Sequence, residues 1–207
     1  MTEDEAQERL GVPRETLDRI SGFLDLLIAE NKRQNLVSRG TLGSVWSRHV
    51  LDSAQLTLFA PASGKWLDLG SGAGFPGLIV AALWQGGVTL IESRKLRVEF
   101  LRQGAEVLGV SDKTEILCSS VEATTPKPFD VISARAFAPL DKLLRLGLPF
   151  STAETVWILP KGRNAKSELD AARSSWQGDF RVEPSLTDAD AGIIVARGVK
   201  PRGKKGR

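Results

Sequence analysis

Two hydrophobic patterns divide the chain. Up to about residue 60, apolar side chains recur every three or four positions, which is the spacing of amphipathic helices. Beyond residue 64, short apolar runs alternate with helical stretches. The first pattern is clearest at Leu17, Ile20, Leu24, Leu27 and Ile28. The chain is therefore expected to begin with helices and to continue as a unit in which strands and helices alternate.

The predicted elements give the fold class. Helices are expected after Pro13, a good first-turn residue, then over 42–59, 76–84, 93–108, 140–148 and 168–175. Strands are expected over 65–69, 87–92, 113–118, 129–133, 155–160, 180–186 and 192–197, the last two as an antiparallel pair. Such alternation predicts an α/β fold with a doubly wound, mostly parallel seven-stranded sheet. We expect a helical extension (1–63), an α/β domain (64–197) and a basic flexible tail (198–207).

Charge changes this picture only at the C-terminus. The chain has 28 basic and 25 acidic residues, and residues 197–207 hold six of the basic ones and none of the acidic ones. Such a tail can contact RNA phosphates, although it can also be a solubilising segment without a partner. The candidate RNA contacts there are Lys200, Arg202, Lys204 and Lys205.

Other features of composition indicate a cytoplasmic protein without a membrane segment. No window approaches 18 uninterrupted apolar residues, and the acidic start, Met-Thr-Glu-Asp-Glu, is unlike a signal peptide. Because Cys118 is the single cysteine, no internal disulfide can form, which fits a reducing compartment. Its lack of cysteine partners also argues against a metal site. We expect Cys118 in the core.

A glycine-rich loop is the strongest candidate site. Asp68-Leu-Gly-Ser-Gly-Ala-Gly-Phe-Pro-Gly77 follows an apolar run and precedes an apolar helix. Glycine allows positive φ angles and close approach of a ligand to the backbone. A P-loop is excluded because no Gly-Lys-Ser/Thr follows. The loop is therefore expected to hold a different nucleotide-like cofactor beyond the ends of the strands.

Two cofactor classes fit this loop. Gly72–Gly77 matches the dinucleotide spacing Gly-x-Gly-x-x-Gly, and Glu92 lies 18 residues beyond Gly74, as a ribose-binding acid would. The longer Asp-x-Gly-x-Gly-x-Gly string starting at Asp68 favours S-adenosylmethionine, which is cationic and has no pyrophosphate. Glu92 and Glu122 then add acids after the second and third strands, suited to the ribose and the adenine side.

The same residues resemble the glucose-inhibited division protein B family, the 16S ribosomal RNA guanine-N7 methyltransferases. The similarity extends from Leu26 to the tail. Its motifs are Asn35-Leu-Val37, Arg48-His-x-x-Asp-Ser53, the Asp68–Gly77 loop with its Phe-Pro-Gly end, Glu92-Ser93, Val121-Glu122, Ser133–Ala138 and Leu159–Gly162. Two departures are a glutamate where the family more often has Asp, at Glu92, and an extra residue, Ala134, before Arg135.

The resemblance implies an S-adenosylmethionine-dependent methyltransferase that acts on 16S ribosomal RNA or the small ribosomal subunit. It also implies that Gly70, Phe75, Val121, Glu122 and Arg135 contact the cofactor. From its residue type alone, Arg135 could instead contact the substrate, through an RNA phosphate or guanine O6. Asp68, Gly72 and Glu92 are added from the glycine-rich loop and the second strand. The candidate cofactor-binding residues are therefore Asp68, Gly70, Gly72, Phe75, Glu92, Val121, Glu122 and Arg135. We expect the protein to be a monomer.

Methyl transfer to guanine N7 sets modest chemical demands. N7 has a lone pair and no proton to lose, so positioning supplies most of the rate and no general base is expected. His49 is expected to bond Asp52, or to line the mouth of the RNA or cofactor site with Arg48. Lys161 and Arg163 are further RNA candidates. Phe137 is expected in the core, with base stacking as the alternative. An NAD(P)-dependent oxidoreductase and a non-catalytic RNA-binding assembly factor are the alternative functions.

Overall fold

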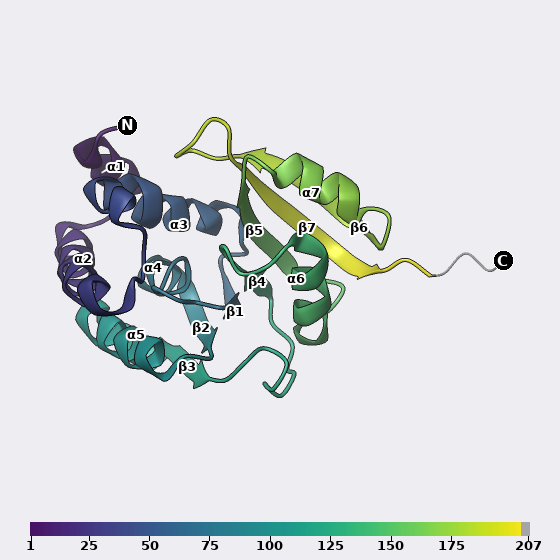
Figure 1. The fold of residues 1–207 in the computed structure, drawn as a ribbon, viewed down its shortest axis with the longest axis horizontal. Coiled ribbons are helices and arrows are strands. Elements are labelled where there is room, and N and C mark those ends of the chain that lie inside the picture. The colour runs from purple at the N-terminus through teal and green to yellow at the C-terminus, as the bar shows by residue number, and fades with distance from the viewer. Residues whose placement is uncertain (204–207) are drawn as a thin grey trace.

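A seven-stranded sheet crosses the molecule in the order β3-β2-β1-β4-β5-β7-β6, as Figure 1 shows. The structure is a computed structural model, and it describes residues 1–203. The first five strands are parallel, and β7 is antiparallel to both of its neighbours. The predicted doubly wound sheet is thus confirmed. The strands are β1 (Ser63–Leu69), β2 (Gln85–Glu92), β3 (Thr114–Cys118), β4 (Val131–Ser133), β5 (Val156–Gly162), β6 (Trp176–Pro184) and β7 (Gly192–Pro201).

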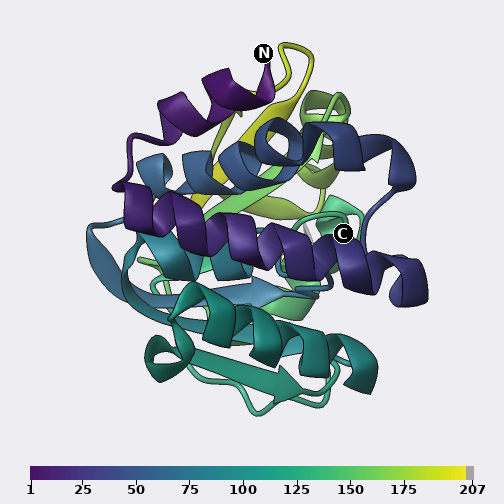
Figure 2. The same ribbon diagram turned by 90° about the vertical axis from the view of Figure 1, so that its left-hand side faces the viewer.

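Helices cover both faces of the sheet. One face carries the N-terminal helices with α4 and α5, and the other carries α6 and α7 (Figures 1 and 2). Successive strand residues alternate between these two cores: Trp66 packs on the α4 side and Leu67 on the α6 side. The helices are α1 (Glu3–Leu10), α2 (Arg14–Gln34), α3 (Asp52–Ala54), α4 (Gly77–Leu83), α5 (Lys95–Leu108), α6 (Leu140–Gly147) and α7 (Ala165–Ala172).

The helix predicted over 42–59 is wrong as a single element. The chain forms a 3-10 segment (Arg39–Ser44), a π-helical turn (Trp46–Leu51), α3 and a second 3-10 segment (Gln55–Phe59). A tertiary contact explains where the π turn begins. The Glu3 carboxylate of α1 accepts hydrogen bonds from the backbone N–H of Trp46 (2.8 Å) and of Ser47 (3.2 Å), so a distant acid caps the segment.

Cys118 is exposed, and its expected place in the core is wrong. The reason is that β3 is an edge strand, in which no side chain is fully buried. Two C-terminal elements also begin earlier than expected: α7 starts at Ala165 rather than 168, and β6 starts at Trp176 rather than 180.

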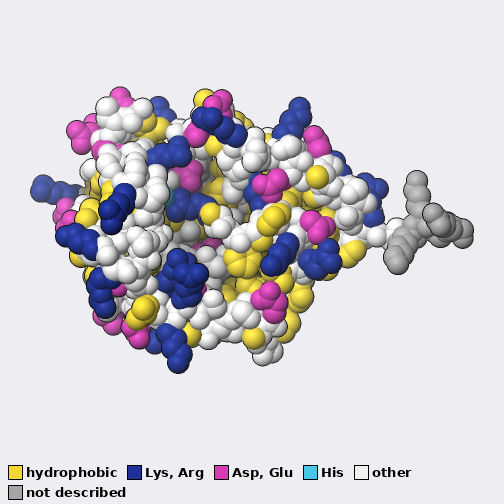
Figure 3. All heavy atoms as spheres, in the orientation of Figure 1, with side chains coloured by type: hydrophobic (Ala, Val, Ile, Leu, Met, Phe, Trp, Pro, Cys, Tyr) yellow, Lys and Arg dark blue, Asp and Glu magenta, His cyan; other side chains and the backbone are white. Residues whose placement is uncertain are grey.

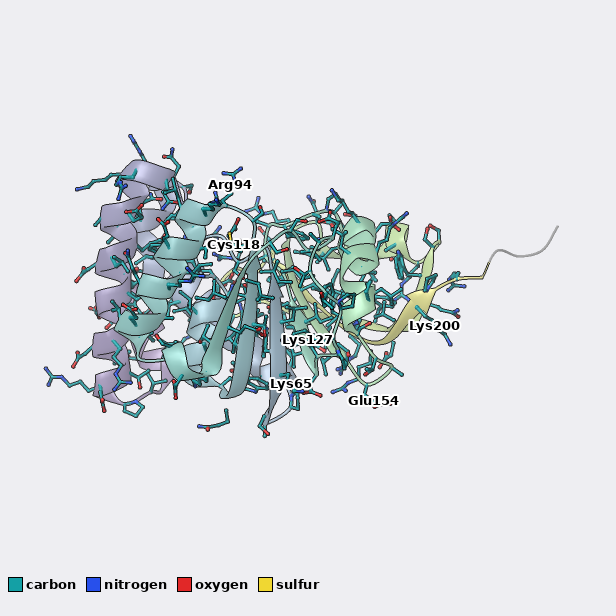
Figure 4. All side chains as sticks on the ribbon, turned by 90° about the horizontal axis from the view of Figure 1, so that it is seen from below. Lys65, Arg94, Cys118, Lys127, Glu154 and Lys200 are labelled. Atoms are coloured by element: carbon teal, nitrogen blue, oxygen red, sulfur yellow. The ribbon has the colours of Figure 1, made fainter. Side chains whose placement is uncertain are left out.

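Residues 198–201 belong to β7, so the flexible tail expected from residue 198 is wrong at its start. Lys200 pairs with Gln177 of β6, and the Arg202 N–H donates to the Ser175 carbonyl. Because β7 runs antiparallel to β5, this basic end lies where the parallel strands begin. Figure 4 shows Lys200 far from Arg94 and Cys118, which mark the carboxyl edge of the sheet. Lys204 and Lys205 lie outside the described residues.

Within residues 1–203, no helix combines the length and the apolar character needed to cross a membrane.

Replacing Gly104 by alanine tests the close packing of α5. An added Cβ would lie 2.9 Å from the Phe23 ring and from the Leu78 side chain. Overpacking costs roughly 1–3 kcal/mol, against about 0.5–1 kcal/mol gained by replacing a helical glycine. We expect urea denaturation to give a free energy of unfolding lower by about 1 kcal/mol. Gly40→Ala, with nothing within 4 Å of the new Cβ, is the control; a Gly104→Ala midpoint at or above the wild-type value would contradict the packing.

Candidate cofactor groove and adjoining cavity

The glycine-rich loop joins β1 to α4 and is fastened to β2. Gly70, Gly72 and Gly74 all have left-handed φ angles, of 70°, 53° and 85°, which favour glycine. The N–H groups of Gly70 and Ser71 donate to the Ile91 carbonyl at 2.9 and 3.1 Å. A side chain at Gly70 would overlap the Phe137 ring. The loop therefore needs its glycines for conformation and for space.

Glu92 closes the same loop from the end of β2. Its buried carboxylate accepts hydrogen bonds from the Gly72 N–H (3.1 Å) and from the Arg94 N–H (2.8 Å). The Arg97 guanidinium lies 3.9 Å away. Each carboxylate oxygen has a further lone pair, so Glu92 can fix the loop and still accept hydrogen bonds from a ligand.

A cavity of about 350 Å³ lies beside Glu92. Four of the predicted cofactor residues line it, and the loop after β3 supplies two of them. Val121 is buried there and Glu122 is exposed. The predicted residues that line this cavity are Gly70, Glu92, Val121 and Glu122.

Asp68, predicted as an acid beside the cofactor, does not line this cavity. The side chain is completely buried on the α4 side of the sheet. Its Oδ1 accepts a hydrogen bond from the Ser133 hydroxyl (2.7 Å), which in turn accepts one from the Trp66 indole N–H (2.8 Å). Burial raises the pKa of Asp68, and the Ser133 hydrogen bond opposes that shift. Asp68 thus joins β1 to β4 beneath the loop.

A second cavity, of about 730 Å³, adjoins the first. Its walls come from the N-terminal segment, the β4–α6 loop, the end of β5 and the β6–β7 loop. Figure 3 shows basic side chains around a hollow on this face of the molecule. The residues Ala136, Phe137 and Ala138 line both cavities. Phe137 is therefore half-buried in the wall between them, rather than in the core as predicted.

Arg135 lies in the second cavity and not in the first. Its guanidinium donates to the Arg48 carbonyl (3.3 Å), lies 3.5 Å from the Asp52 carboxylate and sits 5.2 Å from the centre of the Phe75 ring. Burial lowers the pKa of Arg135, and the charges of Asp52 and Asp68 oppose that shift. The buried Phe75 ring lines neither cavity and supports Arg135 from beneath.

His49 does not bond Asp52, so that prediction is wrong. Its Nε2 is 2.9 Å from the Thr41 hydroxyl, and its ring stacks on Phe75 with 5.0 Å between ring centres. The π-helical turn widens the spacing between residues three apart, and Asp52 bonds Thr187 instead. Burial, and then the charges of Arg135 and Arg48, lower the pKa of His49 to about 4. The imidazole is uncharged at neutral pH.

The predicted RNA-binding cations fall into three groups. Arg48 lines the second cavity and pairs with Asp188 at 3.2 Å, and the exposed Arg163 pairs with Asp190. Lys161 also lines it, but its side chain is only 8% exposed and engages Glu168. Lys200 and Arg202 lie at the opposite edge of the sheet, so the fold does not bring them to this cavity.

Sequence reasoning missed the β6–β7 loop. Thr187 and Asp188 reach the N-terminal segment and complete the second cavity, yet no motif marks them. The part of the chain that the structure describes has no group of three or more His, Cys, Asp or Glu residues able to hold a metal ion.

Known proteins resemble this chain in sequence and in fold. The family model described as "GidB: rRNA small subunit methyltransferase G" matches residues 16–192. The chain is 50% identical to ribosomal RNA small subunit methyltransferase G of Rhizorhabdus wittichii, over 100% of this chain and 99% of the relative. It is 49% identical to the protein of that name from Zymomonas mobilis, over 99% and 98%. Among solved structures, the mitomycin 7-O-methyltransferase shares the fold, with a TM-score of 0.62, 18% identity and coverage of 93% of this chain and 67% of that one.

His49→Gln tests the neutral, buried imidazole. The unfolded chain takes up a proton near pH 6.5, whereas the folded protein resists it until about pH 4. The stability that neutral His49 contributes is therefore present above pH 6.5 and lost as the pH falls towards 4. We expect the free energy of unfolding, measured in urea at each pH, to fall more in the wild type than in His49→Gln between pH 7 and pH 4.5. Parallel pH curves would contradict this assignment.

Proposed function

Because this chain belongs to the rRNA small subunit methyltransferase G family, we propose that it transfers a methyl group from S-adenosylmethionine to N7 of a guanine in 16S ribosomal RNA. One observation carries the proposal for this site. The Glu92 carboxylate, held beneath a glycine loop, faces a small cavity that shares one wall with a larger cavity, which is lined by three pairs of oppositely charged side chains. The first suits the cofactor and the second suits the target base.

The donors and acceptors of the groove fit S-adenosylmethionine. We assign the ribose hydroxyls to Glu92, because a carboxylate is a strong acceptor for them, and the adenine to the Val121–Glu122 loop. Gly70 lets the ligand approach the backbone closely. The 350 Å³ of this cavity is within the usual range for a small-molecule site.

The loop's N–H groups argue against the dinucleotide alternative. A pyrophosphate is bound by free N–H groups of the glycine turn and the helix N-terminus. Here the Gly70 and Ser71 N–H groups donate to Ile91, and that of Gly74 donates to the Ser71 carbonyl. The Gly72 N–H donates to Glu92, which would also place a negative charge against a phosphate. An acid-closed loop favours a cationic ligand.

The role of the chain in the reaction is to position the methyl donor and the target base. S-adenosylmethionine supplies a methyl group on a positively charged sulfur that is already activated for displacement. Guanine N7 has no proton to lose, so no residue has to act as a base; His49, uncharged at neutral pH, is assigned a packing role. We assign Arg135 and Arg48 to the target side, where guanidinium groups suit guanine O6 and RNA phosphates.

Cellular context follows from the substrate. An enzyme that modifies small-subunit rRNA works where ribosomes are assembled, so we propose a cytoplasmic protein. One chain supplies every wall of both cavities, and we therefore propose a monomer. Arg48 and Arg163 are the RNA contacts near the site. Lys200 and Arg202, at the other edge of the sheet, would meet a distant part of a large RNA.

Calorimetric titration separates the two cofactors. We expect S-adenosylmethionine to bind and NADH not to bind under the same conditions, and we expect labelled methyl groups to be transferred to RNA of small ribosomal subunits. Binding of NADH alone would overturn the proposed function. Binding of S-adenosylmethionine without any methyl transfer would favour a non-catalytic RNA-binding factor instead.

Glu92→Gln tests the carboxylate. Hydrogen bonds to charged groups contribute about 1.5–3 kcal/mol, so we expect S-adenosylmethionine to bind roughly tenfold to a hundredfold more weakly. Glu99→Gln, at an exposed position on α5, is the matched control and should bind as the wild type does. Wild-type affinity in Glu92→Gln would remove this residue from the cofactor site.

A further inference from the structure

The wall between the two cavities is a single short segment of the β4–α6 loop. We define this partition as residues 136–138, all three of which line both cavities. Ala136 has a φ of 51°, in the left-handed region that costs an alanine roughly 1 kcal/mol. The Phe137 ring packs against Gly70 of the cofactor loop. A strained conformation of this kind persists only when its surroundings hold it.

An ion pair between the largely buried Lys161 and the half-buried Glu168 holds the C-terminal end of the partition. The Lys161 ammonium, at the end of β5, donates to the Ala138 carbonyl (2.8 Å) and lies 3.0 Å from the Glu168 carboxylate of α7. The same Glu168 oxygen accepts the Leu140 N–H (2.9 Å) at the start of α6. Two charged groups from neighbouring elements thus bond the backbone on both sides of Pro139.

The other end of the partition is held by Arg135. It donates to the Arg48 carbonyl and pairs with Asp52, both in the N-terminal segment. The partition is therefore attached at one end to the N-terminal segment and at the other end to β5 and α7. Loss of either attachment would free a wall that borders the cofactor and the target base together.

We propose that Lys161 and Glu168 are positioning residues, which fix the partition so that the methyl donor and the target guanine meet in line. The proposal rests on the proposed function. It differs from the sequence-based expectation that Lys161 binds an RNA phosphate. Two of the three donors of its ammonium have protein partners, and only 8% of the side chain is exposed. In a reaction that depends on positioning, a displacement of about 1 Å costs about a hundredfold in rate.

The test compares Lys161→Met and Glu168→Gln with Lys166→Met, at an exposed position in the same helix as Glu168. At saturating S-adenosylmethionine and RNA, we expect each of the first two variants to lower kcat at least tenfold. The salt dependence of RNA binding should stay as in the wild type, and the double variant should lose no more than the weaker single variant. Lys166→Met should match the wild type.

A phosphate-binding lysine gives a different result. Each phosphate contact contributes roughly one unit to the slope of log affinity against log salt. If Lys161→Met alone weakened RNA binding and lowered that slope by about one unit, while Glu168→Gln behaved as the wild type, the proposal would be overturned. Wild-type kcat in both variants would overturn it as well.

Hydrogen exchange separates this proposal from the proposed function. We expect the amides of residues 136–138 and 140 to exchange at least tenfold faster in Lys161→Met and Glu168→Gln than in the wild type, with or without RNA. Unchanged exchange would overturn the anchoring. If exchange is faster in the variants but the wild type methylates no guanine, the proposed function is refuted and the anchoring role of Lys161 and Glu168 stands. If Lys161→Met fails to fold, Glu168→Gln, which keeps the acceptor for Leu140, gives the result.

Discussion

The pairing of Glu92 with the glycine loop is the interaction on which the site depends. One carboxylate at the end of β2 accepts N–H groups from Gly72 and Arg94, and so it sets the shape of the β1–α4 loop. The same carboxylate borders the smaller cavity. With other N–H groups of the loop donating to Ile91 and Ser71, the turn presents an acid rather than a set of free donors. This is why a Gly-x-Gly-x-x-Gly spacing here favours a cationic cofactor over a pyrophosphate.

The second constraint is the thin wall between the cavities. Residues 136–138 border both the cavity assigned to the cofactor and the cavity assigned to the target base. The wall is attached at one end to Asp52 and Arg48 and at the other to Lys161 and Glu168. The N-terminal helices therefore belong to the site and do more than extend the domain. They supply Arg48, His49 and Asp52 to the larger cavity, while the sheet supplies the loops opposite.

The sequence predicted the fold and the outline of the groove well, because both follow from local pattern. Alternating strands and helices identify the sheet, and acids after consecutive parallel strands meet at one edge, which brought Glu92 and Glu122 together. The alternation of side chains along β1 also predicts that Asp68 is buried. Asp68 shares a face of the sheet with Trp66, two residues earlier, and α4 covers that face. Its position at the strand end suggested that the Asp68 side chain faces a ligand, but α4 covers it.

Errors arose where distant contacts decide the structure. Lys200 looked like part of a free tail, but β6 pairs with it and carries it to the far edge. His49 looked like a partner for Asp52, but a π-helical turn and the β6–β7 loop redirect both side chains. No sequence pattern around Lys161 predicts that its ammonium group pairs with Glu168 and donates to the Ala138 carbonyl. Most of these partners lie on different elements, such as Lys161 with Ala138 and Asp52 with Thr187, so no local pattern specifies them.

The proposed function requires this groove to deliver a methyl group to guanine N7. The most direct test is to incubate small ribosomal subunits lacking the modification with the protein and labelled S-adenosylmethionine, and to map the label with borohydride reduction followed by aniline cleavage, which breaks RNA at N7-methylguanosine. We expect labelled 16S RNA that is cleaved at one guanine. Labelled RNA that resists cleavage, or label on another molecule, would contradict it.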